Sequence, residues 1–299
     1  MTIELEEPPL TQDNKQVAKD LFAGTMGGIA QVLVGQPFDT VKVRLQSAPE
    51  GTYNGSLDVI KKLLATEGPR GFYKGTLTPL VGVGACVSVQ FSVNEYMKRY
   101  YDKRLNGQPM SIIDYFVCGG VAGFANGFLA SPIEHIRIRL QTQTGNSKNF
   151  NGPLDCAKKI YQTDGIKGIY KGLVPTLIRE SVGLGIYFAT YEALIARELK
   201  TYPRLTRNDI SAWKLCTFGG LSGYTLWIGI YPIDVIKSKL QTDSIKDPKY
   251  RSSLAVIKDV FRTQGIRGFY KGFLPTILRA APANGATFAV FEVTIRLLG

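Results

Sequence analysis

Three short blocks of charged residues recur along the chain, and each is arranged around a proline. Each block reads proline, an acid two residues later, a cation three residues after the acid and a glutamine four residues further on. The blocks begin at Pro37, Pro132 and Pro232, which lie 95 and 100 residues apart. An acid and a cation three positions apart share one face of a helix, and a proline inside a helix bends it. The pattern therefore predicts three kinked helices that carry ion pairs.

Two kinds of pairing are open to these charges. Within one block, the acid can pair with its own cation. If the three helices surround an axis, each acid can instead reach the cation of the next helix and close a ring. A charge at membrane depth costs about 2.5–3.5 kcal/mol, so a ring inside a membrane implies pairing or access to water. Three equivalent blocks favour a ring that acts as a gate.

A second landmark follows each block at a matching distance. It is an acid or glutamine before a glycine, followed by a Tyr-Lys-Gly triplet that begins at Tyr73, Tyr170 or Tyr270. Two motifs repeated three times in register are very specific. On these residues the chain resembles the mitochondrial carrier family, over about residues 17–298, and within it the amino-acid and carnitine/acylcarnitine branch.

The resemblance implies an all-α membrane protein with six transmembrane helices in three pseudo-symmetric repeats. The long helices are expected near 17–46, 74–98, 112–141, 171–197, 212–241 and 271–298. Six such spans are long enough to cross a hydrocarbon core of about 30 Å. The expected organisation is a disordered tail over 1–16 and repeats over 17–108, 109–206 and 207–299. In the family both termini face the intermembrane space, and a short amphipathic helix in each repeat faces the matrix.

Composition sets the broad class. The chain of 299 residues carries a net charge of +12 and is 44% hydrophobic. A basic module that binds nucleic acid or a membrane surface is one alternative, but the cations recur at repeat positions instead of forming one patch. The first sixteen residues lack arginine and do not resemble a signal or transit peptide. The resemblance implies instead an inner-membrane, multi-pass, monomeric protein with no nucleic-acid partner.

The residues for metal or catalytic chemistry are few. The four cysteines have no metal-binding spacing, and we expect free thiols in packed positions. The one histidine, His135, cannot hold a metal alone, and its expected role is that of a helix residue. No nucleophile with a base and an orienting group stands out, and no nucleotide-binding loop does. We therefore expect neither an enzyme nor a cofactor, apart from structural lipid.

Carried over from the family, the gate on the matrix side pairs each acid with the next block's cation. The implied pairs are Asp39–Arg137, Glu134–Lys237 and Asp234–Lys42. The resemblance also implies that the closing glutamines brace these pairs from below. They are Gln46, Gln141 and Gln241. The next cations along each helix, Arg44, Arg139 and Lys239, are expected to be solvated helix ends.

The family's substrate contact points lie seven and eight residues after the glycine of each triplet. These positions hold Gly82 and Val83, Arg179 and Glu180, and Arg279; Gln90 can add a polar contact. An arginine binds a carboxylate and a glutamate binds an ammonium group, so the set suits a small zwitterion such as an amino acid. Alternatively, Arg179 and Glu180 neutralise each other. An acyl ester or another organic anion is a further candidate substrate.

A second gate, on the cytoplasmic side in the family, maps onto four residues that lie twenty or more positions past the triplet glycines. They are Glu95, Lys98, Glu192 and Glu292. The family has a cation in each repeat, but the second and third positions here hold Ile195 and Ile295. We therefore expect a weak second gate with at most one ion pair through Lys98.

The remaining motifs concern packing and lipid. Glycine pairs such as Gly119 and Gly123 recur in all three repeats and predict close helix packing. Backbone N–H groups at a helix start beside a lysine form an anion site, and the resemblance implies that these sites hold cardiolipin phosphates. The implied lipid-binding residues are Gly55, Lys74, Gly75, Gly152, Lys171, Gly172, Lys271 and Gly272.

Overall fold

The fold was analysed in a computed structural model, which describes residues 14–49, 51–106, 108, 110–143, 149–244 and 248–298. All regular elements among the described residues are helices. In chain order they are α1 (Asn14–Ser47), α2 (Ser56–Glu67), η1 (Pro69–Tyr73), α3 (Leu77–Leu105), α4 (Ile112–Thr142), α5 (Pro153–Ile169), α6 (Leu173–Thr201), η3 (Arg207–Asp209), α7 (Ala212–Thr242), α8 (Ser253–Gly268) and α9 (Phe273–Leu298).

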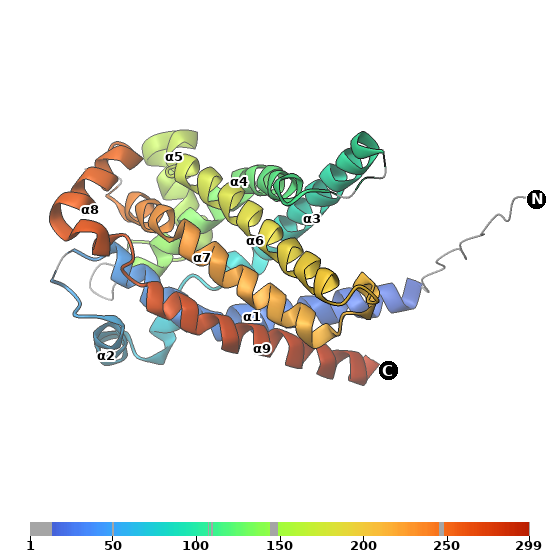
Figure 1. The fold of residues 1–299 in the computed structure, drawn as a ribbon. Coiled ribbons are helices and arrows are strands. Elements are labelled where there is room, and N and C mark those ends of the chain that lie inside the picture. The colour runs from blue at the N-terminus through green and yellow to red at the C-terminus, as the bar shows by residue number, and fades with distance from the viewer. Residues whose placement is uncertain are drawn as a thin grey trace, which may run out of the picture.

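Six long helices and three short ones alternate in the order expected of three repeats, so the predicted fold class is confirmed. The long helices are α1, α3, α4, α6, α7 and α9. α4 packs along α6, and α1 along α9. The short helices α2, α5 and α8 lie at the end of the bundle opposite the chain termini (Figure 1). We call this end the proline end, since the segments that follow Pro37, Pro132 and Pro232 lie there, and the opposite end the linker end.

Several boundaries differ from the expected ones. The first helix begins at Asn14, inside the expected tail, and residues 1–13 lie outside the described residues. The second helix of each repeat begins at Leu77, Leu173 or Phe273, after the triplet and not within it. The triplet glycines have positive φ angles of 78° to 85°, a conformation that favours glycine and interrupts a helix. The triplets therefore form the turn before each helix.

Each short helix packs through a small apolar cluster against the long helix that contains the proline of its repeat. Val59 packs against Val41 and Leu45 in the first repeat. Equivalent clusters surround Ile160 and Val260. Other apolar residues of the short helices lie on the opposite side of the helix and are exposed. These exposed residues are Leu57, Leu64, Leu154, Tyr161, Leu254 and Phe261. They recur at the same positions in the three repeats, as expected of helices that lie in a membrane interface.

The glycine pairs do not all serve close packing, contrary to the sequence expectation. At Gly123 an added Cβ would lie 2.2 Å from the Glu180 carbonyl oxygen, and Gly119 is similarly close to α6. In contrast, an added Cβ at Gly24, Gly28 or Gly223 would have no heavy atom within 4 Å. In the described part of the bundle, helix separation at the linker end therefore differs from one repeat to the next.

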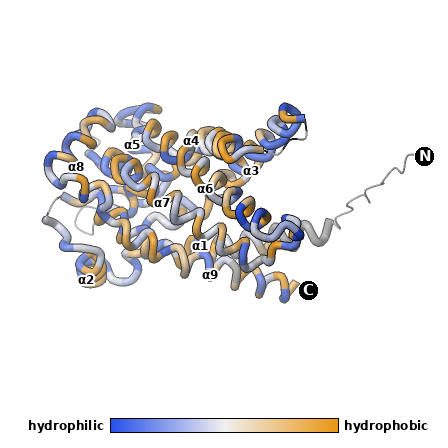
Figure 2. The backbone as a smooth tube through the Cα atoms, in the orientation of Figure 1, coloured by the Kyte–Doolittle hydropathy of each residue, from blue (hydrophilic) through white to orange (hydrophobic). Residues whose placement is uncertain are grey.

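Hydropathy reflects a bundle with a polar interior. Among the described helices, α4 is the one that is long and apolar enough by itself to cross a membrane, with a mean hydropathy of 1.4 in its most apolar window. A bent pair of segments, Pro69–Gly82 and Gly84–Leu105, would be a second span. Figure 2 shows hydrophilic and hydrophobic residues mixed along most helices. The mean hydropathy of the whole chain is zero, because helices that line a charged interior carry polar residues.

Candidate functional site: a charged network at the proline end

Three ion pairs link α1, α4 and α7 just past their prolines. Arg137 Nη2 lies 2.6 Å from Asp39 Oδ2, and Lys42 Nζ lies 2.7 Å from Asp234 Oδ2. Lys237 pairs with Glu134. Each acid therefore meets the cation of the next block, as the ring arrangement requires, and not the cation of its own block. The three pairs together close a ring between the helices.

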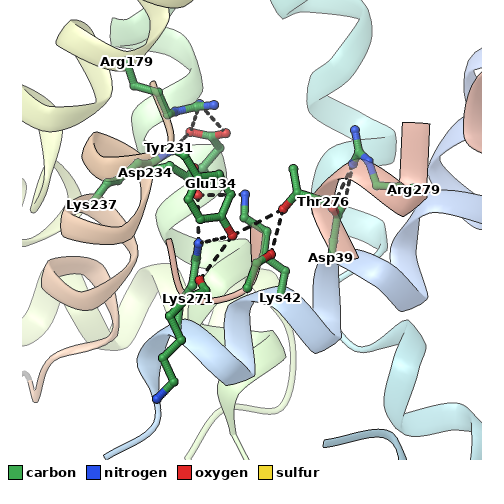
Figure 3. A network of polar contacts seen from close by, with 12 residues as sticks. Asp39, Lys42, Glu134, Arg179, Tyr231, Asp234, Lys237, Lys271, Thr276 and Arg279 are labelled. Carbon is green, nitrogen blue, oxygen red and sulfur yellow. Dashed lines mark hydrogen bonds and ion pairs between the residues drawn. The ribbon is translucent and has the colours of Figure 1, made fainter. Parts of the chain in front are cut away.

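Two arginines from the second helices join this ring. Arg279 of α9 contacts both oxygens of Asp39, at 2.8 Å and 2.6 Å. Arg179 of α6 contacts both oxygens of Glu134, at 2.8 Å and 2.9 Å, and also pairs with Glu180. Figure 3 shows the two arginines approaching their acids from different sides of the network. The arginines expected to await a ligand are therefore held by gate carboxylates.

The first repeat contributes no cation at the equivalent position, which holds Gly82. An added Cβ there would lie 2.8 Å from the Ile133 side chain, so this glycine allows α3 to approach α4. The side chain of its neighbour Val83 lies outside the described residues. As a result, Asp39 and Glu134 each have two cations, whereas Asp234 has Lys42.

Glu180 is buried and its carboxylate is fully engaged. Arg179 contacts Oε1, while Asn126 Nδ2 donates to Oε2 over 2.8 Å and Gln90 Nε2 lies 3.4 Å from the same oxygen. Sequence reasoning missed Asn126, whose signal is a polar residue on an otherwise apolar stretch of α4. In this state Arg179 and Glu180 neutralise each other, so a ligand can reach Glu180 only after these contacts change.

The glutamines differ from the expected braces. Gln46 Nε2 contacts Asp234 Oδ2 at 3.2 Å and Tyr231 Oη at 3.0 Å, so the first glutamine supports a gate pair. Gln141 and Gln241 do not: the first lies 3.5 Å from Thr40 Oγ1, and the second donates to the Lys171 carbonyl oxygen. The bracing expected at these two positions is therefore wrong, because both amides contact neighbouring segments instead of the gate pairs.

Residues that precede the prolines, also missed by sequence reasoning, tie the ring to the triplets. Gln36 accepts a hydrogen bond from Arg137 over 2.8 Å and donates to the Lys74 carbonyl oxygen over 3.0 Å. Tyr231 donates to the Lys271 carbonyl oxygen over 3.2 Å. Both side chains are fully buried. A polar residue immediately before the proline is the sequence signal that could have identified them.

The next cations along the helices are buried, so the expectation of solvated helix ends is wrong. Arg44 makes a bidentate contact with Glu67 at 2.9 Å and donates from Nε to the Gln141 carbonyl oxygen over 3.0 Å. Arg139 donates from Nε to His135 Nε2 over 2.7 Å. Lys239 is also buried. The short helices and the loops of the next repeat cover these cations and replace water as their partners.

His135 is a fully buried structural residue, in keeping with its expected role. Its Nε2 accepts from Arg139, and its Nδ1 lies 3.1 Å from the Ile169 carbonyl oxygen. A carbonyl oxygen can only accept a hydrogen bond, so the proton lies on Nδ1. The histidine thus connects α4 to the end of α5.

Two cavities meet at the network. One of about 190 Å³ lies among the ring residues themselves. A larger one of about 480 Å³ extends toward the linker end, past Tyr187, Tyr191 and Cys216. Trp227 and Arg279 line both cavities, and Lys42 Nζ lies 4.5 Å from the centre of the Trp227 ring. The larger cavity therefore lies between α6, α7 and α9 and adjoins the ring on its linker-end side.

At the linker end, the four residues expected to form a second gate do not meet. Lys98 pairs with Glu95 of its own helix at 3.1 Å, and Glu292 pairs with Arg296 of its own helix at 2.8 Å. Glu192 is buried and makes a bidentate contact with Arg207 of η3, at 2.8 Å and 2.9 Å. Sequence reasoning missed Arg207, because it belongs to a connection and follows no repeat pattern.

The residues expected to bind lipid lie at the outer side of the proline end. Lys74 pairs with Glu67 at 2.6 Å, and Lys171 lies 3.5 Å from Asp243. The ammonium group of Lys271 points away from the charged network (Figure 3). Gly75 and Gly152, from successive repeats, line one cavity of about 280 Å³ with Lys74. The expected lysine and glycines are therefore brought together at the first of the three repeat boundaries.

A helical bundle with a charged ring at one end and a cavity that extends toward the other fits the class of membrane solute carriers. The family model described as mitochondrial carrier protein matches residues 13–105, 108–199 and 208–299. The chain belongs to the mitochondrial carrier family.

Relatives of known name cover nearly the whole chain. The mitochondrial glycine transporter YMC1 of Saccharomyces cerevisiae is 58% identical, with 99% of this chain and 96% of the relative covered. The glutamate/glycine mitochondrial carrier ymc1 of Schizosaccharomyces pombe is 49% identical, with 93% of each covered. The mitochondrial basic amino acids transporter of Homo sapiens is 39% identical, with 93% of this chain and 90% of the relative covered.

The family decides the broad alternatives left by the sequence. The protein is a transporter and not an enzyme, and it crosses the mitochondrial inner membrane several times. A basic nucleic-acid-binding module is therefore no longer a candidate. The net charge of +12 is that of a carrier in which charged residues recur at equivalent positions of the three repeats.

Proposed function

We propose that the protein carries a small amino acid across the inner membrane, with the charged network as its binding site and gate. The observation that carries this proposal is the double contact of Arg279 and Arg137 with Asp39. The same acid is shared by a gate cation and by a cation that lines the cavity. A ligand that binds Arg279 therefore competes directly with the gate.

The charges of the network suit an amino acid. Its carboxylate can bind Arg279 or Arg179 in place of Asp39 or Glu134, which pair with these arginines in the structure. Its ammonium group can then bind the carboxylate that the arginine has released. With all groups ionised, five cations face four carboxylates, which leaves one positive charge in excess. The excess favours ligands with at least one carboxylate.

The exchange of partners gives a mechanism for opening. Once a carboxylate binds Arg279, Asp39 loses one of its two cations. The contacts of Asp39 then stabilise the closed ring less. Buried ion pairs are stable only while each charge has a partner. Substrate binding thus weakens the ring that closes the proline end, and the site becomes accessible from the other side.

Size and relatives agree with a small substrate. The inner cavity of about 190 Å³ has room for a small amino acid. Two relatives are named for glycine, one of them also for glutamate. We therefore rank neutral small amino acids first. A carboxylate without an ammonium group ranks second, because of the excess positive charge.

We further propose that the proline end faces the matrix and that cardiolipin binds at the triplets. The cavity between Gly75 and Gly152, which Lys74 lines, supports a phosphate site there. Backbone N–H groups beside a cation favour an anion. The carrier is proposed to act as a monomer, because one chain contains a complete ring and cavity, and no cofactor is needed.

The test is an uptake screen with purified protein in liposomes. The tracer set consists of glycine, glutamate, lysine, a carnitine ester and a dicarboxylate without an amino group. We expect saturable uptake of glycine and stronger competition from amino acids than from the dicarboxylate. Uptake of the dicarboxylate with no response to any amino acid would overturn the proposal.

A further inference from the structure

Arg207, in the connection between α6 and α7, pairs with an acid of the expected second gate. Both oxygens of Glu192 are occupied by Arg207, at 2.8 Å and 2.9 Å. The carboxylate is 7% exposed, whereas the arginine side chain is 52% exposed. Arg207 therefore lies at the protein surface and covers a buried acid. Its position is set by a turn in which Thr206 and Asp209 cap each other.

The other acids of this gate are held differently. Glu95 and Glu292 pair only along their own helices in the described contacts, and both are about half exposed. Glu192 has no such neighbour, since the position three residues on is Ile195, which is itself buried. The position that corresponds to Arg207 one repeat earlier is Gly107. The connection between the second and third repeats thus has a cation at this position, whereas the connection between the first and second repeats has a glycine.

A second cation lies beside the helix that carries Glu192. Lys98 of α3 pairs with Glu95, but its Nζ also lies 5.9 Å from the centre of the Phe188 ring. Phe188 lies on α6, one helical turn before Glu192. Lys98 therefore lies next to α6. In this structure Arg207 contacts both oxygens of Glu192 and neutralises its charge.

We propose that Arg207 is a latch that holds the linker end open, and that closure transfers Glu192 from Arg207 to Lys98. This inference rests on the proposed alternating access but on no particular substrate. While Arg207 neutralises the charge of Glu192, an ion pair between Lys98 of α3 and Glu192 of α6 gains little. When the helices converge, Lys98 exchanges Glu95 for Glu192, and Arg207 returns to water.

The chain offers a reporter for this exchange. Cys216 is exposed and lines the cavity at the linker end with Tyr187 and Tyr191. Closure of that end would bury it. In a variant whose other three cysteines are replaced by serine, the rate of maleimide labelling at Cys216 measures how much of the protein is open, without added substrate.

The experiment compares three substitutions made on this single-cysteine protein. In Arg207→Gln the acid is released to Lys98, so labelling should slow by at least threefold. In Lys98→Gln closure loses its ion pair, so labelling should be as fast as in the parent or faster, while uptake falls. In Glu192→Gln the shared acid is absent, so adding Arg207→Gln should change the labelling rate by less than a factor of 1.5.

A matched control lies at the same junction. Lys214 pairs with Glu198 between the start of α7 and the end of α6, away from the gate acid. Lys214→Gln should leave labelling unchanged, and melting curves of all variants report folding. Unchanged labelling in a folded Arg207→Gln protein, or an equal slowing in the Glu192→Gln background, would overturn the latch. A failed uptake screen would overturn the proposed substrate instead and leave the labelling result standing.

Discussion

The guanidinium of Arg279 and the carboxylate of Asp39 are joined by two contacts, of 2.8 Å and 2.6 Å, although 240 residues separate them in the chain. Arg279 belongs to the last helix and Asp39 to the first, so the pair closes the ring of helices. Because Asp39 also holds Arg137, one carboxylate connects the cavity wall to the gate. This shared acid is the basis of the first two predictions.

Asp39→Asn should impair transport more than Arg137→Ala. Removing one partner of a buried pair typically costs about 3–5 kcal/mol, because the other charge is left alone. Loss of Asp39 leaves two cations without their acid, whereas loss of Arg137 leaves Asp39 with Arg279. Uptake by reconstituted protein and its melting temperature measure the difference. If Arg137→Ala proved the more damaging of the two, the shared role of Asp39 would be wrong.

Substrate selectivity should separate Glu180 from Arg279. Arg279→Ala removes a charge-assisted hydrogen bond to the substrate carboxylate, worth about 1.5–3 kcal/mol, and should raise KM roughly ten- to a hundredfold for every carboxylate-bearing substrate. Glu180→Gln should weaken amino acids more than a simple carboxylate, as only amino acids carry an ammonium group. Competition curves with both ligand types check this. Equal losses for both ligands in Glu180→Gln would assign Glu180 a purely structural part.

Gly172 should be intolerant of a side chain. Its φ is +85°, and an added Cβ would lie 2.7 Å from the Gln241 side chain. The left-handed backbone alone costs about 1–2 kcal/mol for other residues, so Gly172→Ala should lower the melting temperature. Gly28→Ala is the control, since it lies inside α1 with no heavy atom within 4 Å of the new Cβ. The control should melt at the same temperature as the parent or higher, and a similar drop in both would refute the explanation.

Stability at the proline end should fall in acid because of Glu67. Burial raises the pKa of this carboxyl, but the hydrogen bonds from Arg44 and Lys74 outweigh burial and hold the pKa below its ordinary value of 4.5. A group whose folded pKa is lowered stabilises the fold above its unfolded pKa and loses that contribution as the pH falls through the folded value. The melting temperature should therefore drop below about pH 4.5. In Glu67→Gln the drop should be smaller, and an unchanged acid profile would show that other carboxyls dominate.

Lipid dependence is better tested at Lys171 than at Lys74. Lys74 is held by Glu67 at 2.6 Å, so its reversal would destabilise the protein even without lipid, whereas Lys171 lies 3.5 Å from Asp243. Lys171→Glu should lower the melting temperature in cardiolipin-containing micelles and change little without that lipid. The control is Lys158→Glu, at an exposed position on α5. An identical shift in both micelles would contradict a phosphate site at Lys171.

Much of the architecture was determined by the sequence alone. The repeated blocks predict three bent helices, and the identical spacing within the blocks favours a ring of ion pairs between them. The resemblance to the carrier family implied the pairs Asp39–Arg137, Glu134–Lys237 and Asp234–Lys42, and the structure contains all three. Most helix limits also follow within a few residues, because apolar periodicity and turn residues act locally, but α3 ends at Leu105 and not near 98.

The partners of the remaining charges were decided by the tertiary structure. Arg179 and Arg279 were expected to contact the substrate, yet in the structure they hold gate acids, and Arg44 and Arg139 are buried beneath the short helices. Sequence spacing defines the face of one helix on which a side chain lies, but not the tilt and rotation that bring two helices together. Arg207 illustrates the limit, since it lies in a connection without periodicity and meets Glu192 only through the folded path of the chain.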